Sequence, residues 1–380
     1  MKELKEVYLD NSATTKTCEE AISAIDYMLR ENYGNPSSLH SKGILAEKEL
    51  SKSRKKIADV LKCDEREVYF TSGGTEANNL AVFGSVYGNK KKKKKIIITS
   101  TEHSSVKESA EELKKRGFEL IYIEPNENGQ ADIDNLYSII DDEVALVSIM
   151  HVNNEIGSIN DILKVRNILN LKKSEAIFHV DAVQSFGKID VNVKKIGADL
   201  VSISSHKIHG PKGVGALYIK RGTNIKPMIF GGEQEKRIRP GTESAALISG
   251  FSAAIDSLGN MKENFNHILE LNNYLRTRLK EIPGVVINSA ETMTLPYICN
   301  FSTCKVRSET MLHFLAEKNI YVSSGSACAK GKMSHVLKSM NLDKNVIDTA
   351  IRVSFSRYND INDVDVFIEG LKEGISKVNY

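Results

Sequence analysis

The chain has 380 residues, of which 41% are apolar and 27% are charged, and its formal net charge is +3 at pH 7. These values are typical of a soluble globular protein with one large and one smaller domain. They give no reason to expect direct binding to nucleic acid, and no apolar run approaches the roughly 18 residues needed to span a membrane.

The first residues, MKELKEVYLDNSATT, lack the apolar core of an export signal, so we expect a reducing cytoplasm. The number of cysteines is odd, and no two of them have CxxC spacing. This pattern predicts neither a disulfide framework nor a zinc site, and no metal is expected. The five cysteines are Cys18, Cys63, Cys299, Cys304 and Cys328.

Short apolar, β-branched runs alternate with charged, helix-like segments from about residue 68 onwards. This alternation predicts an α/β fold with a mostly parallel seven-stranded sheet that helices cover on both faces. Ligands bind such sheets beyond the carboxyl ends of the strands. The predicted strands are residues 68–71, 96–100, 120–124, 145–150, 177–183, 200–204 and 215–220.

The pattern changes beyond about residue 255, where a long helical stretch (residues 260–282) precedes short strands and a closing amphipathic helix. We predict a large domain of residues 16–255 and a smaller α+β domain of residues 1–15 and 256–380. The run Lys90–Lys95 stands just before a predicted strand. It is interpreted either as a solvated loop or as a basic docking spot for RNA or a partner.

Several predicted strands end in polar clusters. The stretch FTSGGTEANN (residues 70–79) passes from a strand through two glycines into a helix, with Thr75 near the helix start. Free N–H groups and the helix dipole make such a turn a cradle for phosphate. His103 and Asn154 follow two other strands, in STEHSSV and HVNNEIG. No Walker A or GxGxxG motif occurs, which argues against ATP or NAD.

The pair Asp181 and Lys207 is the most informative chemical signal. Asp181 stands in an apolar strand, in FHVDAVQSFGKI, and a buried carboxylate needs a positive charge or donors nearby. Lys207 follows another strand, in SISSHKIHGPKG. Pyridoxal phosphate requires both residue types, because a lysine forms its Schiff base and an acid pairs with its ring nitrogen. Its phosphate would then need the turn at Thr75 and a hydroxyl such as Ser204.

The chain resembles the cysteine desulfurases, which are fold-type I pyridoxal-phosphate enzymes of the class V aminotransferase group. The resemblance extends from residue 7 to about residue 360 and implies a large domain that binds the cofactor and a smaller domain. Ten segments carry it in order: YLDNSATT, GNPSS, TSGGTEANN, TEHSSV, HVNNEIG, HVDAVQSFGK, SSHKIHGPKG, RPGT, SSGSAC and IRVSFSRYN.

The resemblance implies a role for each predicted site residue. Lys207 would hold the cofactor covalently, Asp181 would pair with its ring nitrogen, and Gln184 would hydrogen-bond its phenolate oxygen. Three side chains would bind its phosphate: those of Thr75, Ser204 and His206. His103 would stack over the ring and act as an acid/base group.

The resemblance also implies a substrate site and a homodimer. Asn154 would contact both cofactor and substrate, and Arg352 would bind the substrate carboxylate through a bidentate pair. Thr242, in the RPGT segment, would reach the phosphate of the neighbouring subunit.

The stretch SSGSACAKGK, residues 323–332, surrounds Cys328 with small residues and is typical of a mobile loop. In the family this loop carries the catalytic cysteine. Cys328 would take sulfur from L-cysteine as a persulfide, leave L-alanine, and deliver the sulfur to a protein acceptor. That acceptor would be an iron–sulfur scaffold, an enzyme of transfer-RNA thiolation or an enzyme of a cofactor pathway, and the sequence does not decide among them.

Three alternatives compete with this function. A selenocysteine lyase would use the same scaffold and the same residues. An aminotransferase of small amino acids is disfavoured by Cys328, since transamination needs no thiol. A non-catalytic sulfur-carrier or adaptor relative is disfavoured by the presence of Lys207, Asp181, His103 and Arg352.

Overall fold

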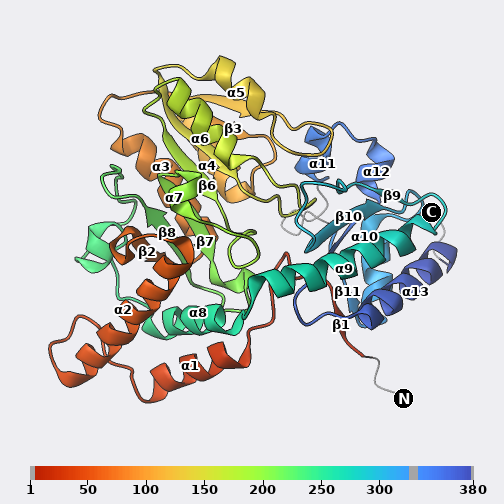
Figure 1. The fold of residues 1–380 in the computed structure, drawn as a ribbon, viewed down its shortest axis with the longest axis horizontal. Helices are drawn as coiled ribbons and strands as arrows, with labels where there is room; N and C mark the ends of the chain where they lie inside the picture. Colours follow the sequence, from red (N-terminus) through yellow and green to blue (C-terminus); the bar gives the residue numbers. More distant parts are fainter. Residues whose placement is uncertain (1–4, 325–332, 378–380) are drawn as a thin grey trace.

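The computed structural model describes residues 5–324 and 333–377, and its centre is a seven-stranded sheet (Figure 1). The strand order is β2-β8-β7-β6-β5-β3-β4, and only β8 runs antiparallel to its neighbours. The predicted mostly parallel sheet is therefore confirmed. Its strands are β2 (Val68–Thr71), β3 (Lys95–Thr99), β4 (Glu119–Ile123), β5 (Val144–Met150), β6 (Ile177–Asp181), β7 (Leu200–Ser204) and β8 (Gly215–Ile219).

Helices cover both faces of this sheet because its strands are apolar on both sides. In β3, Ile97 packs into one core, while Ile96 and Ile98 pack into another core on the opposite face. The first core is closed by α2 (Ser41–Leu61), α5 (Ile133–Ile139), α6 (Ile162–Leu171), α7 (Val193–Ile196) and α8 (Ala245–Ser257). The opposite face is covered by α3 (Gly74–Gly88) and α4 (Ser104–Lys115).

A second, smaller α+β assembly lies beside this sheet, on the right in Figure 1. Its antiparallel sheet has the order β12-β10-β9, and β1 pairs with β11. The strands are β1 (Val7–Tyr8), β9 (Val286–Ile287), β10 (Ile298–Ser302), β11 (Ile320–Tyr321) and β12 (Ala350–Ser354). The helices are α9 (Met261–Lys280), α10 (Ser308–Ala316), α11 (His335–Ser339), α12 (Lys344–Asp348) and α13 (Ile361–Lys377).

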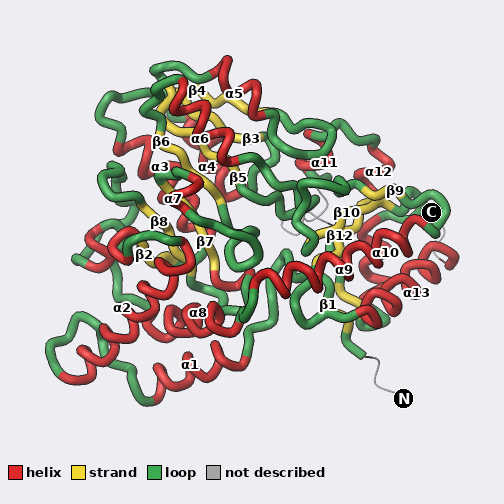
Figure 2. Tube along the Cα trace, in the orientation of Figure 1, coloured by secondary structure: helices red, strands yellow, loops and turns green. Residues whose placement is uncertain are grey.

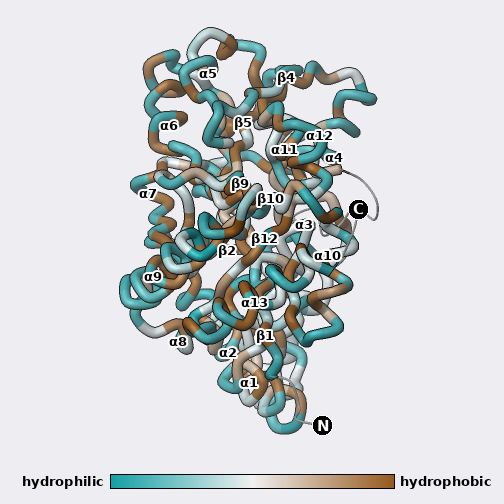
Figure 3. The backbone as a smooth tube through the Cα atoms, turned by 90° about the vertical axis from the view of Figure 1, so that its right-hand side faces the viewer, coloured by the Kyte–Doolittle hydropathy of each residue, from teal (hydrophilic) through white to brown (hydrophobic). Residues whose placement is uncertain are grey.

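The apolar core of this assembly joins the two ends of the chain. Val7 and Leu9 pack with residues of α9, β10, β12 and α13, so the first strand belongs to the same core as the C-terminal elements. The domain boundaries after residues 15 and 255 stay a prediction. A further helix, α1 (Glu19–Arg30), packs against α8 at the far end of the molecule from α5 and α6 (Figure 3).

Two further observations concern the described part of the chain. None of its helices is both long and apolar enough to cross a membrane. Its four cysteines, Cys18, Cys63, Cys299 and Cys304, carry free thiols.

Candidate active site

The sequence-predicted site residues converge at the carboxyl ends of β5, β6 and β7, where loops from several elements meet (Figure 2). They line a cavity of about 320 Å³. Among the predicted residues, those that line this cavity are Thr75, His103, Asn154, Asp181, Gln184, His206, Lys207 and Arg352. Ser204 and Thr242 are not among the described residues that line the cavity. Cys328 lies outside the residues that the structure describes.

One wall of the cavity is the N-terminus of α3, which two glycines shape. Gly73 has a φ of +151°, a conformation that L side chains rarely adopt. A Cβ atom on Gly74 would stand 2.8 Å from the side chain of Val183 and 3.7 Å from Cβ of Ser204. The turn therefore brings the first N–H groups of α3 close to Ser204. The buried Oγ of Ser204 has no hydrogen-bond partner among the described residues.

Lys207 reaches into the cavity from the short helical turn η2 (Ser205–Lys207) that follows β7. Its Nζ donates to the carbonyl oxygens of Ser12 and Ala13, at 2.6 and 2.7 Å. His206 lies beside it, and burial lowers the pKa of this imidazole to about 3, with a smaller effect from the charge of Lys207. His206 is therefore neutral at pH 7.

Asp181 ends β6 and is buried below the cavity. Its carboxylate accepts from the side-chain amide of Asn78 at 2.7 Å and from the N–H of Val183 at 3.0 Å. The amide of Asn78 also donates to Oγ of Ser105 at 2.8 Å, and this oxygen lies 2.8 Å from Nδ1 of His103. One hydrogen-bonded chain therefore connects Asp181 to His103.

The same contacts decide which nitrogen of His103 carries the proton. The backbone N–H of Ser105 donates to Nδ1 of His103 at 3.2 Å, because His103 is the residue that caps α4. An imidazole that accepts at Nδ1 carries its proton on Nε2 when it is neutral. Burial lowers the pKa of His103, the charge of Asp181 raises it by less, and the charge of Lys207 lowers it, so the neutral form predominates at pH 7.

Arg352 stands in β12 and is only 1% exposed. Its Nη2 donates to a carboxylate oxygen of Asp10 at 2.8 Å, and its Nη1 donates to the carbonyl oxygen of Asn154 at 2.9 Å. A buried guanidinium needs such partners. Because Arg352 also lines the cavity, it provides a fixed positive charge at the wall opposite the sheet.

Comparisons with known proteins identify the family. The sequence matches the family described as aminotransferase class-V over residues 7–367. A cysteine desulfurase IscS of Methanosarcina thermophila is 38% identical over 379 residues, which cover 99% of this chain and 93% of that protein. One of Dictyoglomus turgidum is 40% identical over 378 residues, which cover 98% of this chain and 95% of that protein.

This chain belongs to the cysteine desulfurase family. Solved structures agree: a NifS-like protein superposes with a TM-score of 0.94 at 35% identity, over 98% of this chain and 100% of that chain. A structure titled SspA in complex with cysteine gives a TM-score of 0.83 at 29% identity, over 94% of this chain and 100% of that chain.

Cysteine desulfurases of class V depend on pyridoxal phosphate, and the cavity fits this cofactor. The turn at Gly73 and Gly74, with the buried and unpartnered Oγ of Ser204, is suited to a phosphate. A lysine amine and a buried carboxylate line the same cavity, as the ring requires. The residues present are thus those that the cofactor needs.

Several residues of this desulfurase site escaped the sequence analysis. Ser12 and Asp10 come from the N-terminal segment, and Asn78 and Ser105 come from the starts of α3 and α4. Glu102 is fully buried beneath His103, and its pKa is raised to about 8 by burial and by the charge of Asp181. All of them lie inside the quoted segments YLDNSATT, TSGGTEANN and TEHSSV, and that was the one available signal.

Proposed function

We propose that this chain is a pyridoxal-phosphate-dependent cysteine desulfurase that converts L-cysteine to L-alanine and transfers the sulfur to Cys328. The carrying observation is that one cavity presents the amine of Lys207, the carboxylate of Asp181 and the guanidinium of Arg352. The family identity of the chain and the cysteine bound in the structure of SspA support the same reaction.

The cofactor, when bound, supplies an electron-withdrawing ring that makes the substrate Cα–H bond acidic. We assign its phosphate to the α3 turn with Thr75, Ser204 and His206, and its ring nitrogen to Asp181. Asn78 holds the Asp181 carboxylate through one hydrogen bond, and Gln184 faces the same cavity. We assign the phenolate oxygen of the ring to the amide of Gln184.

The substrate would be oriented by its carboxylate and deprotonated by Lys207. Arg352 offers a positive charge from β12. Its guanidinium donates to the backbone carbonyl of Asn154 and so keeps Asn154 beside it. Lys207 lines the same cavity as Arg352, and we assign to its amine the removal and return of the Cα proton. The neutral imidazole of His103, with its proton on Nε2, is suited to exchange a proton with the substrate thiol.

Sulfur transfer then requires a nucleophile. When the C–S bond breaks, both of its electrons stay with carbon, so the sulfur must form a new bond at the same time. The Cys328 thiolate attacks the substrate sulfur, so that an S–S bond forms as the C–S bond breaks. The electron pair of the broken bond goes to the carbon side, where protons complete L-alanine. Cys328 carries the persulfide. A free thiol is only a few per cent ionised at pH 7, so its attack needs a base that removes its proton.

A homodimer completes the proposal. Thr242 is exposed in the loop before α8, apart from the cavity of its own chain. Large apolar side chains are exposed in residues 22–45 and 228–230, including Leu39 at 95% and Phe230 at 85%. Such exposure marks an interaction surface, and we propose that a second copy covers it and receives Thr242 at its phosphate site.

The sulfur acceptor is proposed to be a protein of iron–sulfur assembly or transfer-RNA thiolation in the cytoplasm. The relatives named IscS support the first of these acceptors. The free thiols of the four described cysteines fit a reducing compartment.

The decisive experiment combines three measurements on the purified protein with pyridoxal phosphate. We expect a visible absorbance band, L-alanine formed from L-cysteine in equal amount to the sulfane sulfur, and a persulfide on the peptide that contains Cys328. A protein that binds the cofactor but forms no alanine would contradict the proposal. Light scattering tests the dimer separately, and a fully active monomer would refute it.

A further inference from the structure

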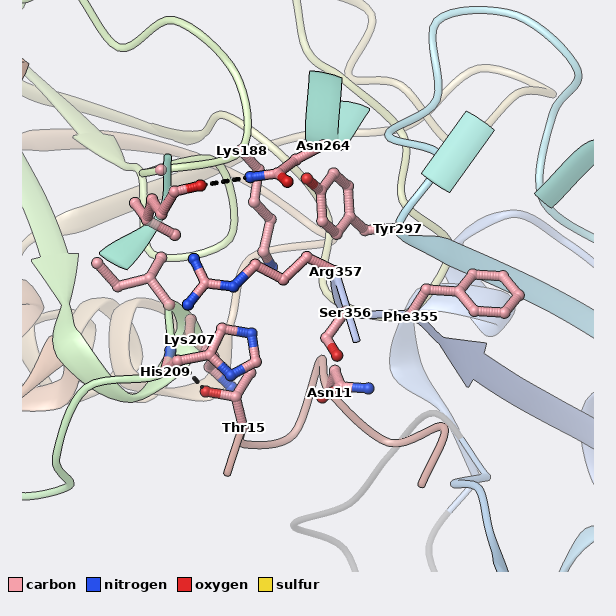
Figure 4. A pocket seen from close by; sticks show the side chains of 13 residues that line it. Asn11, Thr15, Lys188, Lys207, His209, Asn264, Tyr297, Phe355, Ser356 and Arg357 are labelled. Atoms are coloured by element: carbon pink, nitrogen blue, oxygen red, sulfur yellow. Dashed lines mark hydrogen bonds between the residues drawn. The ribbon is translucent and has the colours of Figure 1, made fainter. Parts of the chain in front are cut away.

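A second cavity, of only about 20 Å³, shares Lys207 with the cofactor site but is otherwise lined by different residues (Figure 4). Its most unusual member is Lys188, a buried lysine that stands seven residues after Asp181. Tyr297 and Arg357 come from other segments to line the same space. None of the described lining residues is an aspartate or a glutamate.

The surroundings of Lys188 are unfavourable for a charge. Burial and, to a smaller extent, the charges of Lys207 and Arg352 together lower its pKa to about 7. One contact favours the ammonium, because its Nζ lies over the Tyr297 ring, 5.5 Å from the ring centre. Its one hydrogen-bond acceptor among the described residues is Oε1 of Gln184, at 3.2 Å. Arg357, which also faces the cavity, adds another positive charge.

Gln184 stands between this lysine and the cofactor site. Its Nε2 donates to the carbonyl oxygen of Ser12 at 2.9 Å, and the same carbonyl accepts from Nζ of Lys207 at 2.6 Å. A lysine ammonium can only donate, and a carbonyl oxygen can only accept. These two fixed partners therefore specify the orientation of the amide: Oε1 points to Lys188, and Nε2 points to Ser12.

We propose that Lys188 is a positioning residue that turns the amide nitrogen of Gln184 toward the ring oxygen of the cofactor. The inference rests on the proposed function and on the assignment of Gln184 to that oxygen. An amide turned the other way would present Oε1 to an anionic oxygen and repel it. The ammonium also polarises the amide, which makes its second N–H a stronger donor.

The test is an absorbance titration of the bound cofactor against pH, in the wild type and in Lys188→Met. Methionine fills a similar volume without charge. A donor and a positive charge near the ring oxygen favour the deprotonated chromophore, so their loss should raise its pKa by roughly one unit. The thermal midpoint of the cofactor-free variant should be unchanged or higher, because no ammonium is desolvated. Lys188→Leu, which also carries no donor, serves the same test if the methionine variant does not fold.

Two controls distinguish the positioning of Gln184 by Lys188 from a general effect of losing a buried lysine and from a direct effect of the Lys188 charge on the cofactor. Lys93→Met removes another buried lysine, which lies near Glu175 at 3.8 Å and away from the site, and it should leave the titration unchanged. In a Gln184→Ala background, Lys188→Met should add little further shift. An equal shift in both backgrounds, or no shift in the single variant, would overturn the proposal. A wild type without the visible band would instead overturn the proposed function.

Discussion

Replacing Arg352 by glutamine should weaken cysteine binding far more than cofactor binding. Arg352 is 1% exposed, and the contact proposed for the substrate carboxylate is charge-assisted. Hydrogen bonds to charged groups contribute about 1.5–3 kcal/mol each, and a partner left buried and unpaired adds to the loss. A loss of about 2–4 kcal/mol corresponds to roughly 30- to 1,000-fold in the dissociation constant for L-cysteine.

The substitution also removes the cation that Asp10 faces at 2.8 Å, so a loss of stability has to be distinguished from a loss of binding. Asp10→Asn is the matched control, because it breaks the same ion pair and keeps the guanidinium. Cysteine affinity, followed by the change in cofactor absorbance, should stay equal or improve in Asp10→Asn. Thermal unfolding of both variants shows what the ion pair contributes.

Arg352→Lys keeps a positive charge but cannot form the bidentate pair. Its affinity for cysteine should fall between those of the wild type and Arg352→Gln. Unchanged cysteine affinity in Arg352→Gln, with the cofactor still bound, would refute the reasoning and remove Arg352 from the substrate site.

Three further predictions follow from single residues. Lys207→Ala should bind the cofactor without a covalent link, shown by mass spectrometry after denaturation and borohydride reduction, and should form no alanine; turnover in this variant would move the proton transfer elsewhere. Cys328→Ser should form neither persulfide nor alanine from cysteine, and an unchanged rate of alanine formation would exclude Cys328 as the sulfur acceptor. His179 is fully buried between the hydroxyls of Ser148 and Ser202, and burial lowers its pKa to about 3. As pH falls below about 6.5, this histidine is therefore protonated in the unfolded state while it is still neutral in the folded state. Stability should therefore fall by about 1.4 kcal/mol per pH unit from this group between pH 6.5 and about 3, and His179→Gln should reduce that slope in thermal unfolding measured against pH.

The sheet could be predicted from the sequence because each of its strands is a short apolar run with polar residues at its ends. Asp181 and Lys207 could be linked because a buried carboxylate and a lysine beyond neighbouring strands meet at one edge of a parallel sheet. Both expectations depend on local pattern and on general topology. The structure places the two side chains in one cavity.

The hydrogen-bonded chain from Asp181 to His103 could not be predicted in the same way. Asn78 follows the glycine turn of α3 and, in the sequence, is an ordinary polar helix residue. Its contact with Ser105 depends on how the starts of α3 and α4 meet in space. Asp10 is separated from Arg352 by 342 positions, and only the return of the N-terminal segment to β12 brings them together.

The balance of charge in the site explains why it should respond strongly to its ligands. Lys188 and Arg352, which are buried, and Lys207, which is half-buried, bring three basic groups close together, and burial with the two neighbouring charges lowers the pKa of Lys188 to about 7. Among the neighbouring acids, Glu102 has a pKa raised to about 8 and is mostly neutral at pH 7, which leaves Asp181, Asp10 and Glu155 as counter-charges. The cofactor phosphate and the substrate carboxylate would add negative charge to this group of basic side chains. Because ligands that bind only the folded state stabilise it, the cofactor should raise the thermal midpoint and should also move the pKa of Lys188 back toward its ordinary value.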